Sequence, residues 1–386
     1  MGCARSIWNA KVEEERYYRT YARKYCTIGT YAPIDQTTSQ FKSKELSPWL
    51  SECPSQILRN SAVNWYQTYQ KFMSGKCGRP KRKPKTDKGS IYLTREVFRF
   101  DHCDDGNVRL FIGTKTNNIG YLSFKAHGKF EIPNSLYVRK ERGHYYVSFC
   151  YEQGQPDRKL STNEEHLAFL QGATREYLEE HTMGVDRGVA IPVCAGEQTY
   201  DFTHSQKKNM SKADRYIKRL QRKLARQQKG SNRRAKTKHR IAVHHAKKAN
   251  IRNDFTHKTS RSLVDSSAKI IVFEALRTAM MTRRPKAKQD EQGRFVSNKA
   301  RQKEGLNKSI LNVGWRVIET YTYYKAYSSS KAVFKIPAPT TSQECAKCGH
   351  THPDNRKTQA LFVCGNCGNT DNADHNASLV MAFEAQ

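Results

Sequence analysis

Ile270-Ile271-Val272-Phe273-Glu274 is the stretch that decides the fold of this 386-residue chain. Its continuous apolar run is typical of a strand buried on both faces at the centre of a parallel sheet. A carboxylate beside such a strand is costly to bury unless it is paired or binds a metal ion. Earlier in the chain, the segment from Met183 to Val193 predicts a strand, a turn and a second strand, and Asp186 lies at that turn. The two segments together predict an α/β core with acidic residues at its strand ends.

A third acid, Asp374, stands in Asn372-Ala373-Asp374-His375-Asn376, at the start of a predicted final helix over 376–383. Each acid has an ordinary explanation by itself: Asp186 as a turn residue, Glu274 as a surface acid at a strand end, and Asp374 as a helix N-cap. Together, in a chain poor in acids, they can build a site for two Mg²⁺ or Mn²⁺ ions, which prefer carboxylate oxygens. Spacing along the sequence does not establish that the three meet.

Four of the eleven cysteines form two Cys-x-x-Cys pairs: Cys345, Cys348, Cys364 and Cys367. Each pair stands just before a glycine and fifteen residues separate the pairs, a spacing typical of a zinc site. A redox motif would need one pair near a βαβ unit. His350 and His352 could replace a ligand, but four cysteines already close a tetrahedral site, so we expect structural zinc. The scattered remaining cysteines favour a reducing, intracellular location over a disulfide framework.

The chain carries 68 Lys and Arg against 36 Asp and Glu, a formal net charge of +32. Such a balance favours a nucleic-acid partner, because each neutralised phosphate releases a counterion; a well-solvated surface or a ribosome-associated protein is the ordinary alternative. Residues 205–261 hold 20 basic residues against two acids, and Lys229-Gly230-Ser231-Asn232 divides them into a predicted helical hairpin. A second basic run lies at 78–85. In these two segments, the expected nucleic-acid contacts are Arg79, Lys81, Arg82, Lys83, Lys85, Lys212, Arg215, Arg219, Arg222, Arg226, Arg233 and Arg234.

No run of 18 apolar residues occurs, so no segment is predicted to span a membrane. Residues 1–6 lack the apolar core of a signal peptide. We therefore expect a cytoplasmic protein that has no membrane partner.

The N-terminal part of the sequence differs in pattern from the rest. Residues 1–77 are predicted to be mostly helical, with aromatic residues on helical spacing. Residues 78–156 contain short alternating apolar runs between Gly, Asn and Asp turns, which indicate a small antiparallel barrel or sheet. Residues 157–180 are predicted to be a linker with a short helix. Residues 282–308 are polar and basic and are predicted to be a mobile loop.

Several motifs occur in an order that resembles the TnpB family, the small transposon-encoded relatives of type V CRISPR effector nucleases. Three of them are similar to the family's RuvC motifs: Gly184-Val185-Asp186-Arg187-Gly188, Val272-Phe273-Glu274-Ala275-Leu276 and Asp374-His375-Asn376-Ala377-Ser378. Thr341-Ser342-Gln343-Glu344-Cys345 is close to the run that opens the family's zinc ribbon. The resemblance is strong over residues 181–386 and weaker over residues 1–155.

The resemblance implies an α/β multidomain protein built on an RNase H-like RuvC domain with an inserted zinc ribbon. Asp186, Glu274 and Asp374 would be the catalytic residues that hold magnesium. The expected parts are a helical recognition domain (1–77), a wedge-type antiparallel β-barrel (78–156), a linker or insertion (157–180), a RuvC core with the basic hairpin (181–340), a zinc ribbon (341–370), and the final RuvC motif with its helix (371–386).

The resemblance also implies an RNA-guided DNA endonuclease of a prokaryotic nucleoid, with one protein per guide RNA. A guide RNA from the transposon end would direct it to double-stranded DNA beside a short target-adjacent motif. Cleavage would support maintenance of the transposon. Two alternatives stay open: a strand-transfer transposase with the same acids, and an RNA-guided repressor with an inactive site. The repressor is expected to lose one or more of the three acids, and all three are present.

Overall fold

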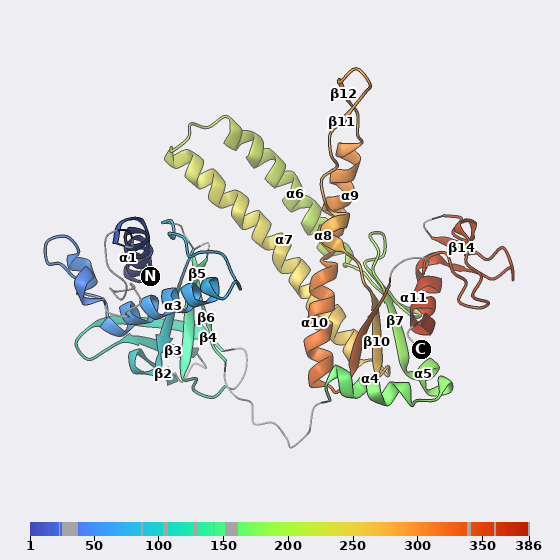
Figure 1. Cartoon of the computed structure of the whole chain (residues 1–386), viewed down its shortest axis with the longest axis horizontal. Coiled ribbons are helices and arrows are strands. Elements are labelled where there is room, and N and C mark those ends of the chain that lie inside the picture. Colours follow the sequence, from blue (N-terminus) through green and yellow to red (C-terminus); the bar gives the residue numbers. More distant parts are fainter. Residues whose placement is uncertain are drawn as a thin grey trace. The chain divides into compact units, whose positions relative to one another are not determined.

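The chain folds into two compact units, Met1–Pro156 and Asp157–Gln386 (Figure 1). The computed structural model describes residues 1–22, 24, 38–85, 88–102, 107–126, 130–141, 143–150, 161–337, 341–358 and 360–384. The first residues of the expected linker, 157–160, lie outside these ranges. Across the described helices, none is long and apolar enough to cross a membrane.

The N-terminal unit packs helices against two small antiparallel sheets. One sheet has the strand order β1-β5-β6 and the other β2-β3-β4. Their bounds are β1 (Gly89–Thr94), β2 (Phe98–His102), β3 (Asn107–Gly113), β4 (Asn118–Lys125), β5 (Ser135–Glu141) and β6 (His144–Ser148). The helices are α1 (Gly2–Tyr17), η1 (Tyr18–Ala22), η2 (Ser39–Phe41), η3 (Pro48–Leu50), α3 (Ser55–Met73) and η4 (Arg95–Val97).

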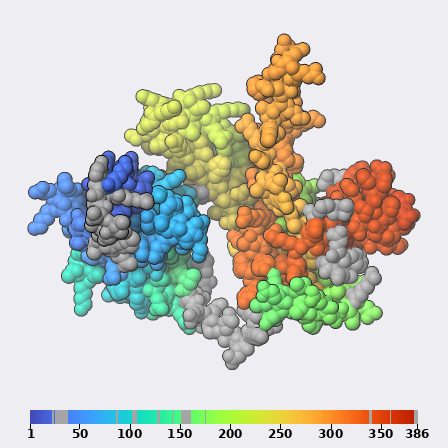
Figure 2. Space-filling view, in the orientation of Figure 1, coloured from blue at the N-terminus to red at the C-terminus, as the bar shows by residue number. Residues whose placement is uncertain are grey.

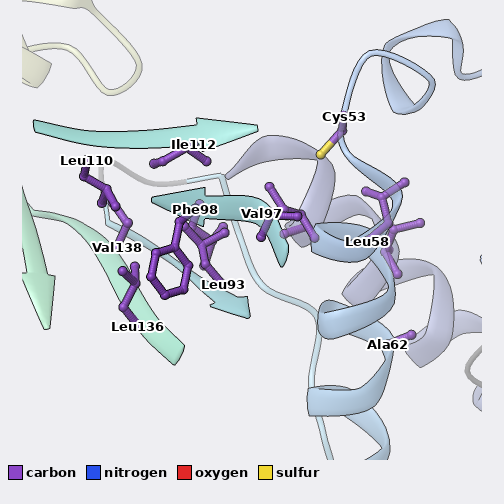
Figure 3. Close-up of a cluster of buried hydrophobic side chains, with 14 of the residues drawn as sticks. Cys53, Leu58, Ala62, Leu93, Val97, Phe98, Leu110, Ile112, Leu136 and Val138 are labelled. Carbon is purple, nitrogen blue, oxygen red and sulfur yellow. The ribbon is translucent and has the colours of Figure 1, made fainter. Parts of the chain in front are cut away.

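Both sheets contribute to one core. Leu93 and Val138 come from the first sheet and Leu110 from the second, and all three pack in a cluster that α3 covers with Leu58 and Ala62 (Figure 3). This arrangement follows from the alternation in the strands, which sends every second side chain inward. The prediction of antiparallel strands is confirmed. Backbone pairing in the described part keeps the two sheets separate, so closure into a barrel stays a prediction.

A mixed five-stranded sheet, ordered β13-β10-β7-β8-β9, forms the centre of the C-terminal unit. The run that opened the sequence analysis is its strand β10, and Ile271, Val272 and Phe273 are fully buried. β10 pairs in parallel with both β7 and β13, which confirms the predicted central strand. The strands are β7 (Thr182–Asp186), β8 (Val193–Ala195), β9 (Gln198–Tyr200), β10 (Ile270–Glu274) and β13 (Ala332–Ile336).

Helices cover both faces of this sheet. Ile271 and Phe273 pack in a cluster with residues of α7, α9 and α10, whereas Ile270 and Val272 pack with residues of α5 and α11. The bounds are α4 (Asn163–Gln171), α5 (Arg175–His181), α6 (His204–Ala225), α7 (Asn232–Asp265), α8 (Thr278–Met281), α9 (Ala300–Val313), α10 (Trp315–Ser328) and α11 (Ala373–Glu384). Small elements in the same unit are β11 (Lys288–Gln289), β12 (Phe295–Val296), η5 (Pro353–Asn355), β14 (Leu361–Val363) and β15 (Thr370–Asn372).

The basic hairpin forms as predicted from α6 and α7 (Figure 1). Thr203 and Gln206 form a capping box at the start of α6, and the Ser231 side chain caps α7 by accepting from the backbone N–H of Arg234. The turn between them coincides with the predicted break at residues 229–232.

The prediction of a mobile loop over 282–308 is wrong for its last third, residues 300–308. Ala300 to Val313 form helix α9, and the backbone N–H of Ala300 donates to the side chain of Asn298. Ile310 and Val313 on one face of α9 are buried. The polar composition hid this helix, because only one of its faces meets the core.

Candidate metal centres

Three acids lie at one end of the central sheet. Asp186 ends β7 and Glu274 ends β10, and these strands are paired so that Val185 lies beside Phe273. Asp374 belongs to the first turn of α11, which packs on β7. Gly184 permits this packing, since a Cβ there would lie 1.9 Å from the backbone oxygen of Ser378. The fold thus brings together three residues that are far apart in the sequence.

The electrostatics of the group indicate a site short of positive charge. Burial raises the pKa of Asp186 to about 7, and the charges of Glu274 and Asp374 raise it further in the same direction. Burial also raises the pKa of Asp374, against the opposing effect of Arg356. A bound cation would relieve this repulsion, so the donor set fits hard divalent ions such as Mg²⁺.

Each carboxylate has a hydrogen-bond donor that orients it. The backbone N–H of Arg187 donates to Asp186 Oδ1 at 2.7 Å, and Thr341 Oγ1 donates to Glu274 Oε1 at 2.6 Å. Arg356 Nη2 donates to Asp374 Oδ1 at 3.2 Å. The three acids do not form a group as tight as the 4.8 Å cluster described below for the cysteines.

Arg187, the residue after Asp186, connects the strands of the site to α10 through hydrogen bonds. It is 4 % exposed, and its Nη1 donates to Glu319 Oε2 at 2.8 Å while its Nη2 donates to the backbone oxygen of Glu274. Its guanidinium also lies 5.1 Å from the ring centre of Phe273. Sequence reasoning missed the support given by Arg187 and Glu319, although Arg187 stands inside a quoted motif. No pattern in the sequence marks Glu319.

The four cysteines form a separate, closed group. Across the residues that the structure describes, theirs are the only grouped ligand atoms of this kind, all within 4.8 Å of one another. Cys345 Sγ lies 3.7 Å from Cys367 Sγ, and Cys348 Sγ lies 3.6 Å from Cys364 Sγ. A tetrahedral zinc with bonds of about 2.3 Å needs sulfur–sulfur distances of about 3.8 Å. The predicted ligand set therefore fits zinc without His350 or His352.

The cysteine segment is fastened to α11 by a buried amide. Asn376 is fully buried, its Oδ1 accepts from the backbone N–H of Ala346 at 3.0 Å, and its Nδ2 donates to the backbone oxygen of Glu344 at 2.7 Å. Asn376 lies two residues after Asp374, and Arg356 reaches the same acid from the cysteine segment. Hydrogen bonds of Asn376 and Arg356 thus connect the cysteine segment to the first turn of α11, which carries Asp374.

The predicted nucleic-acid contacts fall into two groups. Arg79 pairs with Glu15, Arg82 pairs with Glu13, and the Lys83 ammonium lies 3.4 Å from the ring centre of Trp8, so this run packs along α1. Arg234 donates to the backbone oxygens of Leu224 at the end of α6 and Gln227 in the turn, and so connects α7 to the end of α6. The remaining residues that were singled out are exposed: Lys81, Lys85, Lys212, Arg215, Arg219, Arg222, Arg226 and Arg233.

Two family models match the chain. The OrfB_IS605 model, described as "Probable transposase", matches residues 148–284, and the model "Cas12f1-like, TNB domain" matches residues 315–381. The first match contains Asp186 and Glu274, and the second contains the four cysteines and Asp374. The chain belongs to the TnpB family. This TnpB protein carries a Cas12f1-like TNB domain with a four-cysteine cluster, and it is related to the type V effectors of the Cas12f group.

Two relatives extend the similarity beyond the motifs. The Escherichia coli (strain K12) protein named "Putative RNA-guided DNA endonuclease InsQ" is 28% identical over 379 residues, which cover 98% of this chain and 85% of that protein. The Sulfoacidibacillus thermotolerans protein named "CRISPR-associated endodeoxyribonuclease Cas12f1" is 27% identical over 272 residues, or 66% of this chain and 54% of that one. This TnpB protein is therefore similar to the first along nearly its whole length.

A solved structure shares the fold. In a cryo-EM structure of a Cas12f1-sgRNA-target DNA complex, the protein is 12% identical, with a TM-score of 0.53, covering 98% of this chain and 80% of that one. At this identity the likeness concerns the fold alone. It supports a mixed α/β architecture of the Cas12f type for this TnpB protein.

Proposed function

We propose that this protein is an RNA-guided DNA endonuclease in which Asp186, Glu274 and Asp374 hold two divalent ions. The observation that carries the proposal is the placement of three acids at one sheet end, where burial and repulsion raise the pKa of Asp186 to about 7. The name of the E. coli relative supports the same activity. The basic hairpin surface supports a nucleic-acid substrate.

The chemistry is hydrolysis of a phosphodiester bond. Two bound Mg²⁺ ions would activate the attacking water and stabilise the departing 3′ oxygen. Asp186 must lose its proton to act as a ligand, so its raised pKa makes ion binding depend on pH near 7. Arg187 holds the end of β10 in place through the Glu274 carbonyl, and Arg356 neutralises Asp374 until ions bind.

The exposed cations of the basic hairpin are suited to a guide–target duplex. Lys212, Arg215 and Arg219 surround Tyr216 in one surface groove on α6. Cations spaced along a helix contact phosphates and leave the sequence to be read by base pairing. We assign the guide RNA from the transposon end, and its DNA target, to this surface.

A cavity of about 880 Å³ in the N-terminal unit is suited to reading a short target-adjacent motif. Its lining combines amides and a hydroxyl (Asn60, Asn64 and Ser61) with cations such as Arg5 and Lys85. Amide side chains can pair with base edges while cations hold phosphates. Cleavage beside such a motif would serve maintenance of the transposon.

A strand-transfer transposase is the second candidate, favoured by the "Probable transposase" model over residues 148–284. It would use the same acids but bind the transposon ends without RNA. Specific binding to terminal repeats by RNA-free protein, with joining of DNA strands, would establish this alternative.

The deciding experiment combines copurification and cleavage. The protein is purified from cells that transcribe its flanking DNA, the bound RNA is sequenced, and a plasmid library with randomised target flanks is cleaved. Asp186→Ala is expected to lower cleavage about a thousandfold or more while the protein stays folded. Glu197→Ala removes an exposed acid from the turn between β8 and β9 and serves as the matched control. Cleavage that persists in Asp186→Ala would overturn the site assignment.

A further inference from the structure

The chain between α8 and α9 forms a projecting arm, defined here as residues 283–299. Within it, β11 and β12 pair in antiparallel fashion, with Gln289 beside Phe295. Figure 2 shows this orange segment projecting from the C-terminal unit, and Figure 1 places β11 and β12 at its tip, beyond α9. No buried core accounts for it, because every one of residues 286–297 is exposed. The arm is therefore suited to a partner outside the unit.

The arm is ordered by its own hydrogen bonds. Asp290 Oδ1 accepts from the backbone N–H groups of Gln292 at 3.0 Å and Arg294 at 2.8 Å, and the Asp290 N–H donates to the Arg294 carbonyl at 2.9 Å. Asn298 Nδ2 donates to the Lys286 carbonyl at 2.8 Å across the arm. A side chain that leaves β12 is thus presented in a defined direction, at a low entropic cost of binding.

The charges of the arm favour a polyanion. Six basic side chains are exposed on it, and none of them forms an ion pair in the part of the chain that the structure describes. The arm has two acids, Asp290 and Glu291, and the Asp290 carboxylate is engaged in the turn. The six basic residues are Arg283, Arg284, Lys286, Lys288, Arg294 and Lys299.

Phe295 adds an aromatic surface to this charge. Its side chain is 77% exposed, more than any other aromatic side chain among the described residues. A flat apolar ring held out to solvent beside unpaired cations is the combination that binds single-stranded nucleic acid, in which bases stack on the ring and cations hold the phosphates. A base inside a duplex is already stacked on both faces, so the ring suits an unpaired base.

The base of the arm follows the end of β10 along the chain and is anchored to α9. Arg283 follows Glu274 by nine residues, and Asn307 Nδ2 on α9 donates to the Thr282 carbonyl at 2.9 Å. Farther along α9, Lys308 pairs with Asp214 of α6 at 3.0 Å. The arm therefore follows the strand that carries Glu274, after α8, and leads into a helix that contacts the basic hairpin.

We propose that Phe295 stacks on an unpaired base of the single DNA strand that enters the carboxylate site, while the basic side chains of the arm hold its phosphates. This inference rests on the proposed function, because it takes that function's DNA strand as the ligand. It makes Phe295 a positioning residue for the substrate.

The test measures binding apart from cleavage. The full chain with its guide RNA, in an Asp186→Ala background, is titrated with a single-stranded oligothymidylate that carries 2-aminopurine at successive positions. Phe295→Leu keeps an apolar side chain but loses the flat ring, so affinity is expected to fall about tenfold and the 2-aminopurine quenching to disappear. Phe295→Trp is expected to retain both, and Val296→Ala, a neighbour on β12 that is 45% exposed, to change neither.

The outcomes separate this inference from the proposed function. Unchanged affinity and quenching in Phe295→Leu would overturn the stacking role while leaving guided cleavage intact. Weakened binding to Phe295→Trp as well as to Phe295→Leu would also overturn it, since a larger ring must stack at least as well. If quenching depends on Phe295 but no guided cleavage is found, the arm is a DNA-binding element and only the proposed function fails.

Discussion

The two candidate metal centres differ in how completely the chain itself forms them. Four cysteine sulfurs lie within 4.8 Å of one another, at tetrahedral distances, on short turns that belong to one segment. The three carboxylates come from two strands and a helix, they are spread more widely, and the charges of Glu274 and Asp374 add to burial in raising the pKa of Asp186. The cysteine centre is complete with its own ligands, whereas the acidic centre needs cations and a substrate.

This difference indicates that the cysteine centre serves the stability of the fold and that the acidic centre serves its chemistry. A closed ligand set excludes water and substrate, so its metal stabilises the fold. An open, mutually repelling set costs stability until ions bind, which is common where residues are placed for chemistry. The hydrogen bonds of Asn376 and Arg356 join the two centres, so damage to the first should reach the second.

The largest effect is expected from breaking the cysteine centre. Cys364→Ser removes a buried ligand, so bound zinc should fall from one ion per chain to none, and residues 341–372 should become sensitive to protease. Cleavage should be lost as well. When the cysteine segment is disordered, Asn376 loses its bonds to Ala346 and Glu344, and Asp374 loses its bond from Arg356. Cys150→Ser, at an exposed cysteine of the N-terminal unit, is the control. Full cleavage by zinc-free protein would contradict the coupling.

A smaller effect is expected from uncoupling the two centres. Asn376→Ala leaves the Ala346 N–H and the Glu344 carbonyl without their buried partner, which should cost about 1–3 kcal/mol of the free energy of unfolding. Zinc content should stay unchanged while cleavage falls. Chemical denaturation and zinc analysis measure this, with Asn209→Ala on the exposed side of α6 as the control. Equal losses of stability and cleavage in Asn376→Ala and Asn209→Ala would show that Asn376 has no specific role in connecting the two centres.

The smallest effect concerns the acidic centre without ions. Because the folded-state pKa of Asp186 is raised to about 7, its protonated form stabilises the fold, and that contribution is lost as the pH rises from about 4 through 7. Asp186→Asn should therefore unfold at a higher temperature than the wild type at pH 8 in magnesium-free buffer, by a few degrees, and the gain should shrink toward pH 5. Added Mg²⁺ should raise the Tm of the wild type more than that of the variant. A gain independent of pH would show that repulsion is not its cause.

Several features of the fold could be predicted from local patterns in the sequence. The apolar run at 270–273 predicted a buried strand, the two Cys-x-x-Cys pairs predicted a four-cysteine ligand cluster, and the break at 229–232 predicted a hairpin turn; all three appear in the structure. Helix α9 was missed because a helix with one buried face carries few apolar residues. Arg356 and Glu319 carried no signal, since their partners are distant in sequence and nothing local constrains them.

The sequence by itself determined the cysteine ligand set, the central strand and the basic hairpin, because each depends on residues close together in the chain. Only the tertiary structure decided that Asp186, Glu274 and Asp374 lie at one sheet end, with Arg187, Thr341 and Arg356 oriented around them. The physical reason is that strand register and helix packing, such as that of α11 against Gly184, set the distances between residues nearly two hundred positions apart.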